Sequence, residues 1–196
     1  MDTIYYYIIR GIAVILAITL HEMAHGYVSY WLGDNTAKSL GRLSINPLKH
    51  IDWIGAFCLL VFGFGWAKPV PIDYRKYKNG KAGIFMVSLA GPLTNILLAV
   101  LACGFMIIAP IEILQDFFYM FSVVNIGLGA FNLIPIPPLD GSKMLAVLLP
   151  ANTYQKIMQY EQYGFIVLII LLNTGILDPV YNLITQGIIN LINVIY

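Results

Sequence analysis

Long apolar runs separated by short polar stretches organise the chain. A helix needs about 20 mostly apolar residues to cross a bilayer. By that measure we expect membrane-spanning helices at roughly 4–32, 83–110, 118–136 and 163–177. A fifth apolar run, 180–196, is short and carries three asparagines, so it either spans the membrane or lies at its interface.

The stretch 54–72 is apolar as well, but its pattern does not predict a helix. Gly63, Gly65, Pro69 and Pro71 interrupt β-prone residues there and leave no room for a helix of spanning length. We expect a short β-hairpin or re-entrant segment embedded in the membrane, which is tolerated where protein or a water-filled cavity covers its backbone. The predicted fold class is therefore an all-α polytopic membrane bundle of four to six transmembrane helices with one embedded β-hairpin.

The composition is that of an integral membrane protein. Of the 196 residues, 59% are hydrophobic and 11% are charged, whereas about a quarter of the residues of a soluble domain are charged. No polar linker or repeat interrupts the chain, so we expect residues 1–196 to form a single integral membrane domain. The net charge is +1 and no basic run suggests nucleic acid, so the expected partners are the lipid bilayer and other membrane proteins, with homo-oligomerisation left open.

The cations are distributed unevenly between the predicted helices. Two connections hold nearly all of them, whereas the connection around 110–117 holds two acids and no cation. Loops rich in Lys and Arg face the cytoplasm in membrane proteins. We therefore expect a multi-pass protein of the plasma membrane with its N-terminus outside and both basic loops in the cytoplasm. The cations of the first basic loop are Lys38, Arg42, Lys49, Lys68, Arg75, Lys76, Lys78 and Lys81, and those of the second are Lys143 and Lys156.

The motif HEMAH places three titratable groups inside the first predicted helix. His21 and His25 are four residues apart and therefore share one helix face, where they can offer two imidazoles to one ion with Glu22 beside them. An ionisable group inside the membrane costs about 2.5 to 3.5 kcal/mol at the helix centre, so a functional use is the default interpretation. A metal site is the preferred hypothesis, and a hydrogen-bonded structural cluster is the alternative.

A catalytic zinc ion takes three protein ligands and leaves a fourth position for water, so one ligand must come from elsewhere. Asp140 is one candidate, because the prolines of NLIPIPPLDG stop the third helix and leave the aspartate in a turn that can stay at membrane depth. His50, in NPLKHID, is the other candidate. The residues alone leave both open.

Three motifs in this order resemble the site-2 protease family of intramembrane zinc metalloproteases: HEMAH, GPLTN at 91–95 and NLIPIPPLDG at 132–141. The segments NPLKHID and GWAKPVP resemble the small bacterial branch of that family, which has no PDZ domain. The resemblance implies one zinc ion per chain held by His21, His25 and Asp140, with Glu22 as the general base. It implies cleavage of a peptide bond in or near a transmembrane segment of a membrane-protein substrate, as in regulated intramembrane proteolysis.

The same resemblance implies that residues 57–66 form an embedded hairpin that aligns an extended substrate, and that Asn95 faces the active-site cleft. From the residues alone, Asn95 either links helices or contacts substrate backbone. His50 and Asp52 have three open interpretations. They orient a zinc ligand, gate the cytoplasmic mouth of the site, or anchor the loop by a hydrogen bond.

Two other functional classes compete with a protease. Intramembrane His and Asp residues also line ion paths, which is typical of a metal-ion transporter. Glu22 argues against that class, and so does the lack of two related halves in the sequence. A non-catalytic membrane scaffold is the third hypothesis, and the intact HEMAH motif argues against it.

Overall fold

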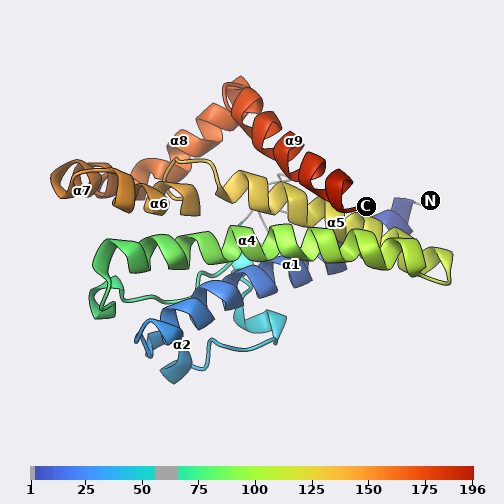
Figure 1. Cartoon of the computed structure of the whole chain (residues 1–196), viewed down its shortest axis with the longest axis horizontal. Coiled ribbons are helices and arrows are strands. Elements are labelled where there is room, and N and C mark those ends of the chain that lie inside the picture. Colours follow the sequence, from blue (N-terminus) through green and yellow to red (C-terminus); the bar gives the residue numbers. More distant parts are fainter. Residues whose placement is uncertain (1–2, 56–65) are drawn as a thin grey trace.

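Three long helices form the centre of the molecule. The computed structural model describes residues 3–55 and 66–196. Within these ranges α1 (Thr3–Trp31), α4 (Gly80–Ile108) and α5 (Glu112–Asn132) contact one another, and each is long and apolar enough to cross a membrane (Figure 1). The first three predicted spans are therefore confirmed as helices.

The third span begins and ends several residues earlier than the sequence predicted. Glu112 starts α5, where an acid in the first turn is favoured by the helix dipole. The helix ends at Asn132 because the proline-rich segment that follows lacks the backbone N–H groups needed to continue it.

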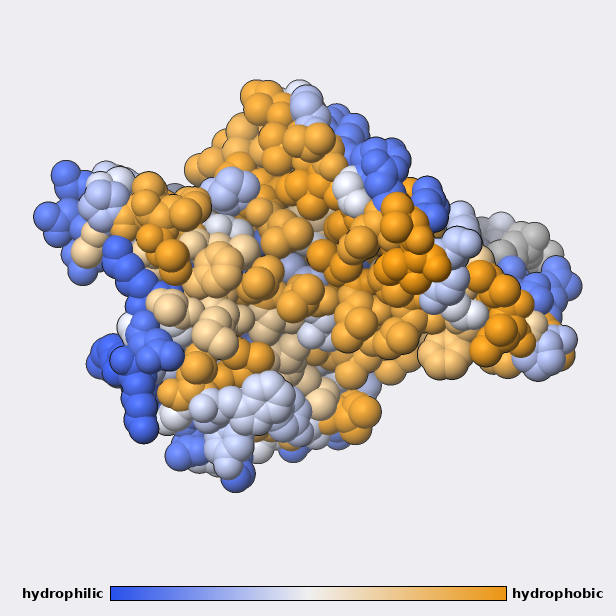
Figure 2. Space-filling model, in the orientation of Figure 1, coloured by the Kyte–Doolittle hydropathy of each residue, from blue (hydrophilic) through white to orange (hydrophobic). Residues whose placement is uncertain are grey.

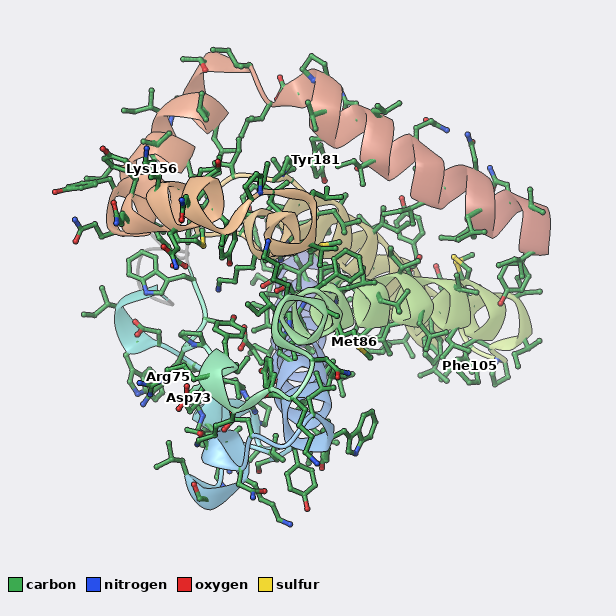
Figure 3. All side chains as sticks on the ribbon, turned by 60° about the vertical axis from the view of Figure 1, so that its left-hand side comes forward. Asp73, Arg75, Met86, Phe105, Lys156 and Tyr181 are labelled. Atoms are coloured by element: carbon green, nitrogen blue, oxygen red, sulfur yellow. The ribbon has the colours of Figure 1, made fainter. Side chains whose placement is uncertain are left out.

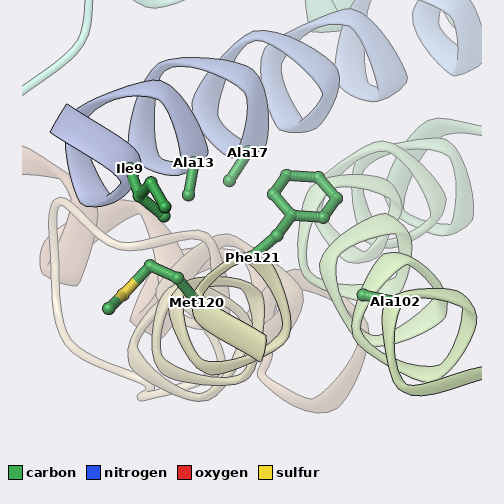
Figure 4. Packing of buried hydrophobic residues seen from close by; sticks show 6 residues of the cluster. All are labelled: Ile9, Ala13, Ala17, Ala102, Met120 and Phe121. Carbon is green, nitrogen blue, oxygen red and sulfur yellow. The ribbon is translucent and has the colours of Figure 1, made fainter. Parts of the chain in front are cut away.

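Small side chains allow the three helices to pack closely. Ala13 and Ala17 of α1 and Ala102 of α4 are almost fully buried, and they surround Met120 and Phe121 of α5 (Figure 4). Lipid tails are as apolar as leucine, so membrane helices associate through such close packing rather than through a hydrophobic driving force.

The C-terminal part of the chain forms a bent pair of helices. α8 (Glu161–Thr174) is too short to span a membrane alone, and it ends at Gly175 with a φ of +70°. α9 (Asp178–Ile195) follows at an angle of 86° to α8. The described helices therefore provide three candidate spans, or four if the bent pair counts as one, which is the low end of the predicted range. α9 packs on α4 and α5 through Ile188 and Ile192.

The short helices gather at one end of the bundle, and both termini lie at the other end (Figure 1). Figure 2 shows hydrophilic residues clustered at that first end and a broad apolar surface across the middle.

At the same end, Lys81 Nζ donates a hydrogen bond of 2.7 Å to the carbonyl of Leu149 and so links the start of α4 to the second basic loop. The short helices are α2 (Thr36–Ser39), η1 (Pro47–Lys49), η2 (Tyr74–Lys76), α6 (Asp140–Leu148) and α7 (Ala151–Gln159).

Most of the predicted β-hairpin lies at residues 56–65, outside the described residues. On its flanks, Ile51 and Ala67 form one isolated antiparallel bridge. Lys68 N–H donates to the His50 carbonyl at 2.9 Å beside it. No strand longer than this bridge occurs in ranges 3–55 and 66–196, so the hairpin stays a prediction.

Candidate metal centre

Three donor atoms converge between α1, α4 and α6. His21 and His25 are buried on one face of α1, and their Nε2 atoms are 3.1 Å apart. Asp140 Oδ2 lies 3.2 Å from His21 Nε2 and 3.1 Å from His25 Nε2. The ligand atoms of these three residues all lie within 4.8 Å of one another, which is close enough to share one metal ion.

Asp140 reaches this position as the first residue of α6 and not in a turn as the sequence suggested. Leu139 precedes it with a φ of −66° and a ψ of 155°, so the extended backbone after the prolines changes to helix at the aspartate. An acid in the first helical turn is favoured by the helix dipole. A Cβ at Gly141 would meet the carbonyl oxygens of Leu133 and Ile134, so the glycine lets α6 approach the end of α5.

The carbonyl of Val87 fixes the orientation of His25. His25 Nδ1 lies 2.6 Å from this oxygen, and a carbonyl can only accept a hydrogen bond. Nδ1 therefore carries the proton, and in the neutral ring Nε2 presents its lone pair to the donor group. Such a partner on the far nitrogen is what holds a metal-binding histidine in its tautomer.

A relay of two asparagines does the same for His21. Asn125 Nδ2 donates to the Phe121 carbonyl at 2.8 Å, and Asn95 Nδ2 donates to Asn125 Oδ1 at 2.7 Å. Asn95 Oδ1 therefore faces His21 Nδ1 at 2.5 Å and accepts its proton. Both asparagines are fully buried, so both amide groups of Asn95 are used inside the protein.

The residues present fit a zinc ion. Two imidazole nitrogens and a carboxylate oxygen lie about 3 Å apart, and with both rings in the neutral tautomers assigned above their lone pairs repel one another unless a cation lies between them. Two histidines and one carboxylate are a common donor set for catalytic zinc. A Cβ at Gly91 of α4 would overlap both imidazole rings, so this glycine leaves the space that the donor group needs.

Glu22 lies beside the donor group but on the adjacent face of α1. Its Oε2 accepts a hydrogen bond of 2.8 Å from the backbone N–H of Val70. In the described part of the chain, Oε1 has no hydrogen-bond partner. Among residues 3–55 and 66–196, the carboxylate is thus held through one of its two oxygens.

His50 and Asp52 lie away from the three donors. His50 is buried, and its Nε2 donates to the Ser44 carbonyl at 2.8 Å. Asp52 Oδ1 accepts from the N–H groups of Ile54 and Gly55 at 3.0 and 2.9 Å. These contacts lie within the loop itself, and the roles of both residues stay predictions. No contact of the described chain joins either residue to the donor group.

Sequence reasoning missed several residues of this arrangement. Asn125 could have been found, because an asparagine in an apolar helix needs a hydrogen-bond partner. Val87 and Val70 act through backbone atoms, which leave no signal in side-chain chemistry.

Fold and site together define a membrane-embedded protein with a His, His, Asp donor group. The chain belongs to peptidase family M50, the site-2 protease family, as its motifs indicated. The model of this family matches residues 107–173. YwhC of Bacillus subtilis is 39% identical over 199 residues, covering 94% of this chain and 91% of the relative.

Two further relatives are more distant. Rip2 of Mycolicibacterium smegmatis is 28% identical over 84% of this chain and 66% of the relative. MJ0611 of Methanocaldococcus jannaschii is 34% identical over 71% of this chain and 70% of the relative. Each of the three relatives carries the name "Putative zinc metalloprotease". No solved structure matches the chain significantly.

Proposed function

We propose that this protein is a zinc-dependent intramembrane endopeptidase that hydrolyses a peptide bond in or near a transmembrane segment of a membrane-protein substrate, as in regulated intramembrane proteolysis. Membership of peptidase family M50 and the names of the relatives support a zinc metalloprotease. The observation that carries the proposal is the convergence of His21, His25 and Asp140 with both imidazole lone pairs turned inward.

In this proposal the three residues hold one zinc ion per chain. When bound, zinc lowers the pKa of its water toward about 7 and polarises the scissile carbonyl. His21 lies ten residues before the end of α1 at Trp31, which is about 15 Å at 1.5 Å per residue. That distance is roughly half the thickness of a bilayer core, so the protein must supply the site with water at membrane depth.

Glu22 is the general base of the proposed reaction. It takes a proton from the attacking water and passes it to the leaving amine of the substrate. Glu22 follows His21 directly in α1, so its carboxylate lies near the donor group. It projects from a face of the helix adjacent to the one that carries His21 and His25. Val70 N–H occupies one carboxylate oxygen, and in this proposal the other, which no described residue bonds, takes the proton.

The substrate must be extended at the site of cleavage. A transmembrane helix hides its carbonyls in internal hydrogen bonds, and pairing with an open strand edge replaces those bonds. We assign this task to the predicted hairpin around 57–66. The antiparallel bridge between Ile51 and Ala67 supports a hairpin there, because it joins the two segments that lead into and out of it.

The experiment is a comparison of wild-type protein with Glu22→Gln in native membranes. We expect one zinc per wild-type chain by elemental analysis. The variant should keep its zinc and lose about 10²- to 10⁴-fold in rate, since the base is removed while the ligands stay. Mass spectrometry of released membrane-protein fragments identifies the substrate.

Two outcomes would contradict the proposal. Equal fragment sets from both proteins would favour a scaffold. Zinc uptake into proteoliposomes that depends on His21 and occurs without any cleavage would favour a metal-ion transporter.

A further inference from the structure

A segment that is irregular at its start and includes the short helix η2 near its end lies across the face of α1 that carries Glu22. This segment, residues 66–77, is called the strap below. Its contacts on α1 recur at helical spacing, at Glu22, Gly26 and Ser29. The adjacent face of the same helix holds His21 and His25, so the strap and the donor group flank one turn of α1 from two sides.

The strap contacts each of the three α1 positions directly. Val70 N–H donates to Glu22 Oε2 at 2.8 Å. A Cβ at Gly26 would lie 3.1 Å from Val70 Cγ1, so the missing side chain lets the strap approach the helix. Tyr77 Oη lies 2.7 Å from Ser29 Oγ. Val70 is buried, with an exposed fraction of 5%.

Charged residues fix the strap on both sides of Val70. Arg42 Nη2 donates to the carbonyls of Lys68 and Pro69 at 2.9 and 3.2 Å. On the other side, Asp73 N–H donates to Asp34 Oδ2 at 2.8 Å. The backbone at Val70 is therefore held in position before any substrate arrives.

The flanking sequence makes Val70 a single donor. Pro69 and Pro71 have no backbone N–H, and both favour an extended backbone at their neighbours. The tripeptide Pro69-Val70-Pro71 thus offers one N–H, and the structure directs it to the carboxylate of Glu22.

We propose that the backbone N–H of Val70 is a positioning group for Glu22. It binds Oε2 and restricts the three side-chain torsions of the glutamate, so that Oε1 faces the attacking water. This inference rests on the proposed function, in which Glu22 is the general base. A displacement of about 1 Å at a catalytic group can cost about 10²-fold in rate, so loss of the bond should appear in kcat.

The first test exchanges single backbone amides for esters. The exchange at Val70 removes the N–H and keeps the side chain, and the same exchange at Ile72 is the matched control. In the described part of the chain, the N–H of Ile72 donates to no group. We expect kcat to fall at least about 10-fold for the Val70 ester, with KM and zinc content unchanged, and the Ile72 ester to match the wild type.

The second test needs no enzymatic activity. Hydrogen exchange at Val70 is measured in wild type and in Glu22→Ala, and the two prolines simplify the assignment because they carry no amide hydrogen. We expect exchange at Val70 to become at least about 10-fold faster in the variant, while exchange at Lys68 and Asp73 stays the same.

Unchanged exchange at Val70, or equal kcat values for the two esters, would overturn the inference. If the wild type carries zinc and cleaves substrate while these results occur, only the inference fails. If the wild type carries no zinc and cleaves nothing, the proposed function fails with it.

Discussion

At the scale of single residues, the geometry of the donor group depends on groups that do not touch the shared space. His21 is oriented by Asn95, and Asn95 is oriented by Asn125 through a fully buried amide contact. His25 needs no such relay, because the Val87 carbonyl accepts its Nδ1 proton directly. The orientation of the His21 ring should therefore change when a neighbouring side chain is substituted, whereas the orientation of the His25 ring depends on a backbone atom.

Asn95→Ala tests the relay. Removing the amide leaves His21 Nδ1 without its acceptor, and loss of such a partner typically costs 10- to 100-fold in metal affinity. We expect zinc affinity to fall in this range, measured by competition with a chelator. Asn173→Ala is the matched control, because Asn173 is exposed on α8 and donates to the Ile169 carbonyl of its own helix. Equal affinities for the two variants would exclude a positioning role for Asn95.

Asp140→Ala and His50→Ala distinguish the two candidates for the third ligand. Asp140 Oδ2 lies 3.1 and 3.2 Å from the two imidazole nitrogens, whereas His50 bonds to Ser44 in its own loop. We expect Asp140→Ala to lose zinc and His50→Ala to keep it with lower thermal stability. Elemental analysis and a melting curve decide the matter, and the reverse pattern of zinc contents would refute the assignment.

At the scale of elements, a buried carboxylate ties the strap to the end of α1. Asp34 is fully buried and accepts hydrogen bonds from Ser29 and Thr36 and from Asp73 N–H and Lys76 Nζ of the strap. Figure 3 shows Asp73 and Arg75 on the same side of the molecule as Lys156 of α7 and away from Phe105 of α4. Burial alone would raise the pKa of the Asp34 carboxyl, but these donors outweigh it and hold the pKa well below its ordinary value.

Asp34→Asn should therefore destabilise the protein in a pH-dependent way. A lowered pKa in the folded state stabilises the fold at pH values above the unfolded pKa of about 3.9, and this contribution is lost as the pH falls through the folded value. Hydrogen bonds to a charged group contribute about 1.5 to 3 kcal/mol, so we expect a loss of about 2 kcal/mol at neutral pH.

The measurement is the unfolding midpoint in detergent between pH 3 and 7. The gap between wild type and Asp34→Asn should be constant above about pH 5 and narrow below about pH 4. Asp178→Asn, which changes an exposed carboxyl at the start of α9, is the control and should show no such gap. A gap that is independent of pH would show that the charge of Asp34 is not what holds the strap.

At the scale of the whole molecule, the helix topology brings both basic loops to one end. Three helices that run back and forth place the described parts of the connections 32–79 and 133–160 at one end, where Lys81 at the start of α4 donates to the Leu149 carbonyl. The short connection between α4 and α5 lies at the opposite end with the termini (Figure 1). One assignment of sidedness therefore fixes the orientation of these three connections.

Cysteine labelling tests the predicted orientation. In a background with Cys58 and Cys103 replaced, we expect Lys76→Cys to react with an impermeant reagent only after the cells are opened. Glu112→Cys should react in intact cells, because the positive-inside rule predicts basic loops in the cytoplasm and the opposite end outside. Labelling at position 76 from outside would invert the predicted orientation and move the proposed site of cleavage to the other membrane half.

The spans show how far sequence reasoning reaches. The runs at 4–32 and 83–110 match α1 and α4 closely, since the length of an apolar run decides a membrane helix without reference to its neighbours. The run at 163–177 was wrong as a span of its own, because Gly175 ends α8 and the chain bends by 86° into α9. Gly175 marks the end of α8 in the sequence, but the placement of α9 against α4 and α5 depends on contacts between distant segments.

The sequence by itself determined the membrane helices and the pairing of His21 with His25, because run length and a spacing of four residues act within one helix. The tertiary structure decided which groups contact the turn of α1 that carries His21, Glu22 and His25. Val70, Asn95 and Asp140 contact it from positions 48, 74 and 115 residues away from their partners along the chain. Those contacts depend on how α4, α6 and the strap pack against α1, and packing between distant segments leaves no periodic signal in the sequence.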